Sequence, residues 1–241
     1  NNTANVDTAG YSRQQTMTVA SASQNVGVGF IGTGTTLSDV RRIYNSYLDS
    51  QLQSSTALNS DATAFLGQAS STDTLLSDSS TGISTVLSTF FTQLQGVSTT
   101  ATDSSARAQF LTTATALSAR FNSISTQLAA QNSSINSQLT SLAGQVNTLS
   151  SSIAHLNQQI TQASASGATP NSLLDARNES VRQLNVLVGA KVVSNNGSYD
   201  VYIGTGQSLV SGTTANTLSA GPGTSDATQY TLKVNYSQTS S

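Results

Sequence analysis

Residues 104–165 read SSARAQFLTTATALSARFNSISTQLAAQNSSINSQLTSLAGQVNTLSSSIAHLNQQITQASA, with no proline before Pro170. Apolar or small residues recur along this stretch at alternating steps of four and three, which is the heptad pattern of a helix that packs along one stripe. We therefore predict one helix of 62 residues from Ser104 to Ala165, about 93 Å long at 1.5 Å per residue. Its stripe consists of Phe110, Ala114, Leu117, Phe121, Ile124, Leu128, Gln131, Ile135, Leu139, Leu142, Val146, Leu149, Ile153, Leu156 and Ile160.

One irregularity interrupts the stripe at Gln131, its single polar member. Two steps of four follow one another there, which is a stutter of the kind that locally unwinds a supercoil. Gln131 either sets the register as a polar layer or hinge, or marks the place where the helix changes its packing partner. We favour the change of partner, and we expect at most a modest break between Gln131 and Gln138.

Three shorter segments also have a helical period. Ser38–Asp39 offers a capping hydroxyl and a carboxylate for a helix start. Gly189 offers a left-handed C-terminal cap, and Asn171 or Ser172 offers an N-cap. The break between the first two helices is expected at residues 79–82, where Ser, Ser, Thr and Gly follow one another. The predicted helices are Ser38–Ser77, Ile83–Ser98 and Leu173–Val188.

The two ends of the chain favour strands. Residues 13–20 alternate loosely and residues 27–33 could form a second short strand, so residues 1–35 are interpreted as an extended arm or β-hairpin. Beyond Lys191 the period changes to two, and Asn196–Gly197 is a strong hairpin signal. Further strands are predicted at 208–210 and 229–236.

The fold class is therefore mainly α with a β part. Residues 1–35 form the arm, residues 36–190 an elongated helical bundle or rod with long heptad-patterned, coiled-coil-like helices, and residues 191–241 the start of a β-rich outer domain. The chain begins at Asn1, and we take it as a fragment that a targeting segment could precede.

The composition of the 241 residues excludes several functions. Charged residues make up 8% of the chain and the net charge is −2, which disfavours nucleic-acid binding. No apolar run is long enough to span a bilayer, so no membrane insertion is expected. The chain has no cysteine, one histidine and 76 serine or threonine residues. We predict no catalytic, cofactor-binding or metal site, and no enzyme activity.

Three motifs contain residue types that can carry chemistry. The G-x-G-x-x-G of Gly27–Gly32 lacks the helix that a dinucleotide site requires, so a twisted hairpin is the better interpretation. His155 is expected to be solvated on the flank of the long helix. Asp175 has Arg177 and Arg182 nearby, which predicts ion pairs on the surface.

The N-terminus carries a resemblance to a known family. Ala4, Asn5, Thr8, Gly10 and Tyr11 match the N-A-N-x-x-T-x-G-Y signature of the axial proteins of the bacterial flagellum. Tyr11–Gln14 favours the hook-associated proteins of the hook–filament junction. Three further stretches are similar and lie in the same order: Val40–Tyr44 with Gln51–Leu52, Phe90–Phe91 with Ala106–Arg107, and Asn171–Arg177, which resembles an N-x-L-L-D-x-R motif. Ser208–Gly212 also resembles a loop and strand of the outer domain.

The resemblance implies a structural role: an axial assembly protein that joins hook to filament. Such proteins are exported unfolded, so a secreted, extracellular location in the flagellum follows. Implied partners are other copies of the chain, the hook protein, the second junction protein and an export chaperone before secretion.

The alternatives are a secreted Ser/Thr-rich adhesin or surface stalk protein, and a hydrolase attached to a rod. The hydrolase would need paired carboxylates in a cleft, and the sequence offers no such pair. We expect the isolated chain to be monomeric, because the remaining subunit contacts are polar and small. A coiled-coil dimer through the heptad stripe is the other outcome.

Overall fold

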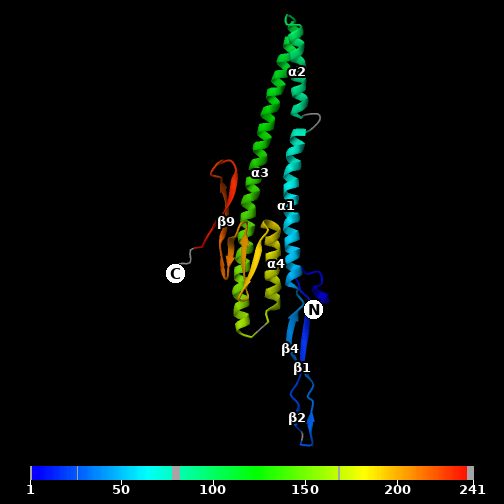
Figure 1. Cartoon of the computed structure of the whole chain (residues 1–241), viewed down its shortest axis with the longest axis vertical. Coiled ribbons are helices and arrows are strands. Elements are labelled where there is room, and N and C mark those ends of the chain that lie inside the picture. The colour runs from blue at the N-terminus through cyan, green and yellow to red at the C-terminus, as the bar shows by residue number, and fades with distance from the viewer. Residues whose placement is uncertain (1, 26, 78–81, 168, 238–241) are drawn as a thin grey trace. The chain divides into compact units, whose positions relative to one another are not determined.

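The computed structural model describes residues 2–25, 27–77, 82–167 and 169–237 (Figure 1). Long helices form the middle of the chain and strands lie toward both ends, which confirms the predicted class of a mainly α protein with a β part. The elements are η1 (Thr3–Asn5), β1 (Gln14–Ala20), β2 (Gln24–Asn25), β3 (Phe30–Ile31), β4 (Thr35–Arg42), α1 (Ser46–Ser77), α2 (Ile83–Thr99), α3 (Ser104–Ala165), α4 (Asn171–Val188), β5 (Lys191–Asn195), β6 (Ser198–Ile203), β7 (Gln207–Ser211), β8 (Thr214–Ala215), β9 (Thr217–Pro222) and β10 (Tyr230–Asn235).

Helix α3 runs from Ser104 to Ala165 as predicted, without a break at the stutter. Helix α2 ends one residue later than expected, at Thr99. The predicted break between the first two helices falls mostly at residues 79–81, which lie outside the described residues. The heptad pattern and the lack of proline were therefore sufficient to define the longest element of the chain.

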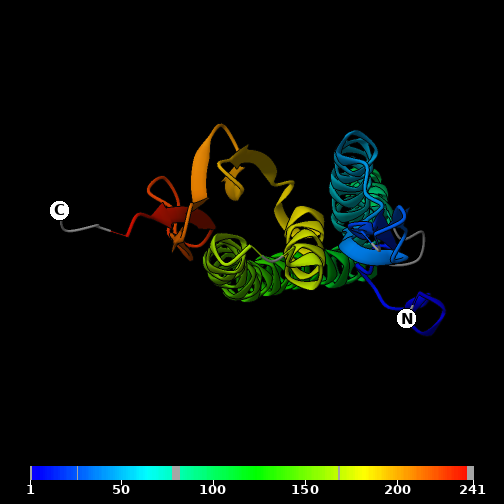
Figure 2. The same cartoon turned by 90° about the horizontal axis from the view of Figure 1, so that it is seen from below.

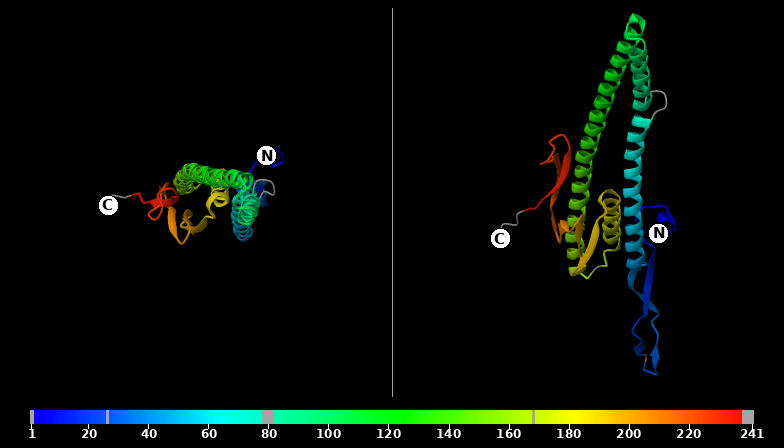
Figure 3. Two further views of the ribbon diagram at one scale, coloured as in Figure 1. Left: turned by 90° about the horizontal axis from the view of Figure 1, so that it is seen from above. Right: turned by 45° about the horizontal axis from the view of Figure 1, so that its top comes forward.

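The predicted helix start at Ser38 is wrong. Residues Thr35–Arg42 form strand β4, which pairs antiparallel with β1 (Figure 3). Met17 lies opposite Asp39 and Thr18 lies opposite Leu37, so Ser38 is the extra residue of a β-bulge rather than a helix cap. The pairing with β1, about twenty residues away, overrides the local capping signal.

Helix α1 begins instead at Ser46, and Asn45 supplies its cap. The Asn45 Oδ1 accepts hydrogen bonds from the backbone N–H groups of Tyr47 (3.0 Å) and Leu48 (3.2 Å). Asp49 adds a negative charge in the first turn, where the helix dipole favours it.

The chain divides into two compact units, and helices α1 and α3 contribute to both. The first, here called the sheet unit, comprises the described parts of residues 1–60, 140–221 and 232–241. Its four-stranded antiparallel sheet has the order β5-β6-β7-β8 and arches over α3 and α4 (Figure 2). The interior between them has an apolar core, which includes fully buried Val146, Ile153, Val181, Leu184, Val201, Leu209 and Val210. Each such side chain stabilises the fold by about 1.5–3 kcal/mol through burial.

Two turns of the sheet unit confirm the sequence analysis. Gly189 closes α4 in the left-handed conformation, with φ +61°. Asn196 and Gly197 both have positive φ and join β5 to β6 in a two-residue hairpin. The predicted N-cap is wrong, because Pro170 stands at that position and no side chain caps α4. The Asn171 amide donates instead to the carbonyl of Val40 in β4.

The second, here called the helical unit, comprises the described parts of residues 61–139 and 222–231. The Phe90 ring in α2 lies 5.2 Å from the Phe110 ring in α3, between centroids. Gln131 of α3 donates to the Thr72 hydroxyl of α1 at 3.2 Å, so the polar member of the stripe bonds to a neighbouring helix. Beyond the stutter, from Leu142 on, the stripe packs against α4 and the sheet. The change of packing partner that we favoured is consistent with these contacts.

Asparagines of α3 hold the strands by their backbone. The Asn147 side chain accepts from the N–H of Leu218 (2.6 Å) and donates to its C=O (2.9 Å). Within the helical unit, the Asn136 side chain donates to the Thr228 carbonyl (2.7 Å) and accepts from the Tyr230 N–H (3.0 Å). Each asparagine therefore replaces one pair of ladder hydrogen bonds at the helix surface.

Candidate functional site

The polar centre of the sheet unit lies on helix α4, on a face where a helix usually carries apolar residues. Asn171, Asp175, Asn178 and Asn185 lie four, three and seven residues apart and are all buried, as is Arg177 beside them. Positions with these spacings share one helix face. Buried polar groups persist when they are hydrogen-bonded, so the partners of this stripe define what it does. We call these residues and their partners the latch.

Asp175 fixes the N-terminal arm, here residues 2–44. Its Oδ1 lies 3.0 Å from Nη1 of Arg42 at the end of β4, and its Oδ2 accepts from the backbone N–H of Ser12 at 3.1 Å. The two charged side chains are only 9% and 12% exposed. Because Gln14 of β1 lies opposite Arg42 of β4, one carboxylate therefore holds both strands of the β1–β4 ribbon against α4, at the same end of the ribbon. Removing either partner of such a buried pair leaves an uncompensated charge.

Three further contacts support the arm on α4 and on the segment just before it. Gly10 has φ +79°, and a Cβ there would lie 2.8 Å from the Glu179 Cβ, so no larger residue fits this approach. Asn171 binds Val40, as described above, and the Thr169 hydroxyl donates to the Asp39 carboxylate at 3.1 Å. Thus the arm contacts the first turns of α4 and the segment just before this helix at several points.

Arg177 connects α4 to α3 and to the sheet. Its Nη1 donates to Asn157 Oδ1 (2.9 Å) and to the Gly197 carbonyl (2.7 Å), and its guanidinium lies 3.6 Å above the centre of the Tyr199 ring. Burial lowers the pKa of Arg177 below its usual value. The charge is therefore retained in a largely dry site by hydrogen bonds and by the aromatic face.

Asn157 is fully buried and uses all of its hydrogen-bonding capacity. Its amide group donates to the carbonyls of Tyr199 (2.9 Å) and Gly212 (2.6 Å). Its oxygen accepts from Arg177 and from the Tyr199 N–H (3.0 Å). One side chain of α3 thereby joins α4, the first hairpin and the turn after β7.

Tyr44 closes the latch where the arm passes into α1. Its hydroxyl donates to Asp49 at 3.0 Å, and the Arg42 guanidinium lies 4.4 Å from the centre of its ring. Burial raises the pKa of Tyr44 above its usual value, and the Tyr199 and Asp49 neighbours add to this rise. The same Arg42 therefore contacts both Asp175 and Tyr44.

The signature at the N-terminus forms a compact turn of its own. The Thr8 N–H donates to the Asn5 carbonyl and the Tyr11 N–H donates to the Thr8 carbonyl, each at 3.1 Å. The Tyr11 hydroxyl donates to Asn2, which also binds the backbone N–H of Gln14. These residues place Ser12 for its bond to Asp175.

The predicted surface ion pairs of Asp175 are wrong. Asp175 is buried and pairs with Arg42 from the arm, while Arg182 pairs with Glu179. Arg177 turns into the interior instead of toward Asp175. The reason is that the arm packs onto the polar face of α4 and supplies the cation from 133 residues away.

The other motifs lie where they were expected. His155 is exposed on α3, and Gly27–Gly32 falls at the β2–β3 hairpin, with no helix opening there. Within the described ranges, no three His, Cys, Asp or Glu side chains gather into a metal-binding group. No helix in that part of the chain is long and apolar enough to cross a membrane.

Sequence reasoning missed the asparagines and Tyr44. Asn136, Asn147 and Asn157 recur ten or eleven residues apart on α3, close to three helical turns, and this spacing was the available signal. Asn157 is not apparent from the sequence, because in a chain rich in Asn and Gln an asparagine is expected to be exposed to solvent. Tyr44 falls inside the helix that the sequence predicts from Ser38, so its place at the junction of arm and helix is not apparent from the sequence.

Taken together, the fold is that of a mainly helical protein whose N-terminal arm is latched to a helix before the β part. The chain matches the family described as "Flagellar hook-associated protein FlgK helical domain" over residues 69–241. The chain belongs to this family, which confirms the resemblance found in the sequence.

Relatives and a solved structure agree with this assignment. Flagellar hook-associated protein 1 of Salmonella typhimurium is 36% identical over 236 residues, which is 96% of this chain and 42% of that protein. The protein of the same name from Escherichia coli K12 is 34% identical, over 96% of this chain and 43% of that protein. The structure of the flagellar hook junction protein FlgK from Burkholderia pseudomallei has a TM-score of 0.69 and 34% identity, covering 76% of this chain and 33% of that one. The chain thus spans less than half the length of these relatives.

Proposed function

We propose that this chain is part of a structural component of the bacterial flagellum, an axial assembly protein that joins hook to filament. The membership of the family and the names of the relatives support the role. The observation that carries it is the latch, because a buried ion pair and several backbone bonds hold an arm against a rod helix. Such an anchor suits a subunit that must keep its arm in one orientation within an assembly.

The proposed partners are other copies of the protein, the hook protein and the second junction protein, with an export chaperone before secretion. The proposed place of action is outside the cell, in the flagellum. Exposed aromatic and aliphatic side chains of the helical unit support subunit contacts, among them Phe65, Phe91, Leu111 and Phe121. The role needs no catalysis, and we propose that the protein is not an enzyme.

Deleting the gene in the source bacterium tests the role. We expect intact hooks without attached filaments in electron micrographs, and filament protein shed into the medium. Cells that keep their filaments but lose surface adhesion would contradict the proposal and favour the adhesin alternative.

Complementation with two neighbouring arginine variants of the whole protein tests the latch. Arg42→Ala should restore motility poorly, because it leaves Asp175 buried without its cation. Arg41→Ala is the matched control, since the Arg41 side chain is 69% exposed and pairs only with Asp39 within the described residues. Equal motility of the two variants would refute a role for the latch.

We also propose that the isolated 241-residue chain is monomeric. The heptad stripe beyond the stutter already packs against α4 and the sheet, which removes that part from pairing with a second copy. Light scattering at micromolar concentration should give a mass near 24.8 kDa. A stable mass of twice this value would refute the proposal.

A further inference from the structure

The four-stranded sheet ends in a free edge at β5. Because Asn196–Gly197 is a two-residue turn, Asn195 and Ser198 form the closing hydrogen-bonded pair, and alternation then turns the N–H and C=O groups of Val192 and Ser194 away from β6. Tyr199 of β6 lies opposite Ser194, and its own N–H and C=O bind Asn157 instead of β5. This is the pattern expected when Ser194 and Tyr199 form a pair without hydrogen bonds between them. Along the described chain, the outward groups of β5 have no partner.

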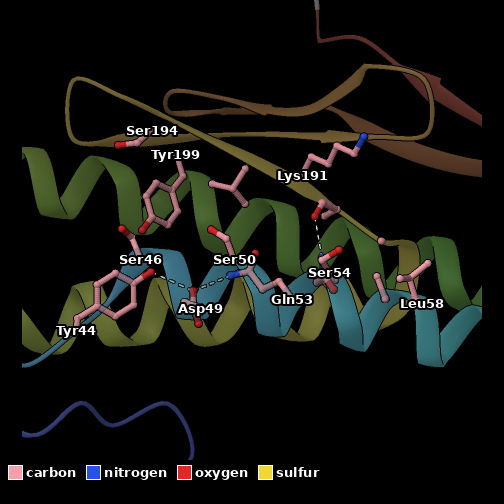
Figure 4. Close-up of a pocket in the computed structure, with 15 residues that line it drawn as sticks. Tyr44, Ser46, Asp49, Ser50, Gln53, Ser54, Leu58, Lys191, Ser194 and Tyr199 are labelled. Carbon is pink, nitrogen blue, oxygen red and sulfur yellow. Dashed lines mark hydrogen bonds between the residues drawn. The ribbon is translucent and has the colours of Figure 1, made fainter.

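A cavity of about 490 Å³ separates this edge from helix α1 (Figure 4). Val192 and Ser194 line it from β5, and Tyr199 lines it from β6. From α1 it is lined by Ser46, Ser50 and Ser54, which lie four residues apart on one face and are joined by Ala57. These small side chains leave space beside the helix, and the larger Asp49, Gln53 and Leu58 of α1 complete the lining.

A second, independent observation concerns Asn185, which lines the same cavity from the end of α4. The residue is only 3% exposed, and its Nδ2 donates to the Ala190 carbonyl at 2.8 Å. Its Oδ1 is buried and has no hydrogen-bond partner among the described residues. A buried acceptor without a hydrogen bond lowers the stability of the fold, so a ligand that supplies a hydrogen-bond donor here would be favoured.

We infer that the groove between β5 and α1 binds an extended peptide segment, which adds to the sheet as a strand next to β5. A backbone offers donors and acceptors that repeat every two residues, and the free groups of Val192 and Ser194 have this spacing. The cavity is lined by the serine hydroxyls, by the Asn185 side chain and by one residue of each charge, Asp49 and Lys191, so a side chain of the segment that points into it is an uncharged hydrogen-bonding one: Ser, Thr, Asn or Gln. The Asp49 carboxylate already accepts hydrogen bonds from Tyr44 and Gln53, so it does not require a cationic side chain from the segment. This inference goes beyond the proposed junction role and does not depend on it.

The test uses a random nonapeptide library displayed on phage and panned against the chain. Ser194→Pro removes the outward N–H but leaves the ladder to β6, because a proline is tolerated on an edge strand where its nitrogen faces away. Ser50→Trp fills the groove from the helix side. The matched controls are Ser194→Ala, which keeps the N–H, and Ser125→Trp on an exposed position of α3.

We expect enriched peptides whose affinity falls by about tenfold or more in Ser194→Pro and Ser50→Trp, as for the loss of a hydrogen bond or of the space. The two controls should bind as the original chain does, and the amides of Val192 and Ser194 should exchange hydrogen more slowly when peptide is bound. A library that yields no binder overturns the inference. Peptides that bind the Ser50→Trp variant as well as the original chain overturn it too, even if Ser194→Pro fails to fold.

Discussion

The sheet unit and the helical unit are stabilised in different ways. Of the buried hydrophobic residues in the described chain, Ile124 alone belongs to the helical unit, and the rest belong to the sheet unit. Large apolar side chains are exposed in both units, with Phe65 at 72% in the helical unit and Phe30 at 74% in the sheet unit, so the contrast lies in the buried residues. A helix without a buried face depends on propensity, length and partners. The difference teaches that the sheet unit has its own buried core, whereas the described part of the helical unit buries almost no apolar side chain.

The largest expected effect is on the latch. Asp175→Ala should lower the free energy of unfolding of the sheet unit by about 3–5 kcal/mol, because Arg42 then stays buried without a counter-charge. Urea denaturation followed by far-UV circular dichroism measures this loss. Asp61→Ala, on an exposed turn of α1, is the control and should change stability little. Similar values for the two variants would contradict the role of Asp175.

The double variant Arg42→Met with Asp175→Leu sharpens this result. Replacing both charges by apolar residues of similar size should recover most of the lost stability, since the desolvation cost disappears with the pair. A double variant as unstable as Asp175→Ala would mean that the Ser12 bond, not the ion pair, dominates.

The next largest effect is expected from leucines that are buried in one unit and exposed in the other. Leu184→Ala removes a fully buried side chain of the sheet unit and should cost about 2–5 kcal/mol. Leu111→Ala, at an exposed position of the helical unit, should cost well under about 1 kcal/mol in the isolated chain. Denaturation midpoints of the two variants measure the difference. A large loss for Leu111→Ala would show that its face is covered in solution.

A pH dependence follows from the raised pKa of Tyr44. Above about pH 10 the unfolded chain loses this phenol proton before the folded chain does, so the unfolded state binds fewer protons and the free energy of unfolding falls as pH rises. The contribution is complete below that pH and disappears as pH rises through the folded pKa. Tyr44→Phe should therefore show a shallower loss of stability between about pH 10 and 11.5. Parallel curves for the two chains, from denaturation at several pH values, would refute this cause.

The smallest effect concerns the stutter. Gln131→Leu removes a hydrogen bond to Thr72 but continues the apolar stripe beside Leu128 and Ile135, which line the same groove. The two changes should nearly cancel, to within about 1 kcal/mol. Thermal unfolding of the helical unit measures the balance. A loss well above that value would favour the alternative that Gln131 sets the register.

The sequence was informative where local pattern decides the structure. The limits of α3 follow from its heptads, and the β5–β6 hairpin follows from Asn196–Gly197, because both signals act within a few residues. The failures are long-range. Ser38 carries a good capping signal, yet pairing with β1 makes it a bulge. Asp175 has arginines beside it in sequence, yet its partner is Arg42, and no local rule connects residues 133 positions apart.

The asparagines of α3 hold the strands through hydrogen bonds to the strand backbone. Asn147 binds the N–H and C=O of Leu218, and Asn157 binds those of Tyr199 and the carbonyl of Gly212, so both bind groups that every non-proline residue carries. Attachment of the β part is therefore largely indifferent to the sequence of the attached strands. Outward-facing residues of this part are free to diverge between relatives, or to be exchanged by design, while the helix continues to hold the same backbone.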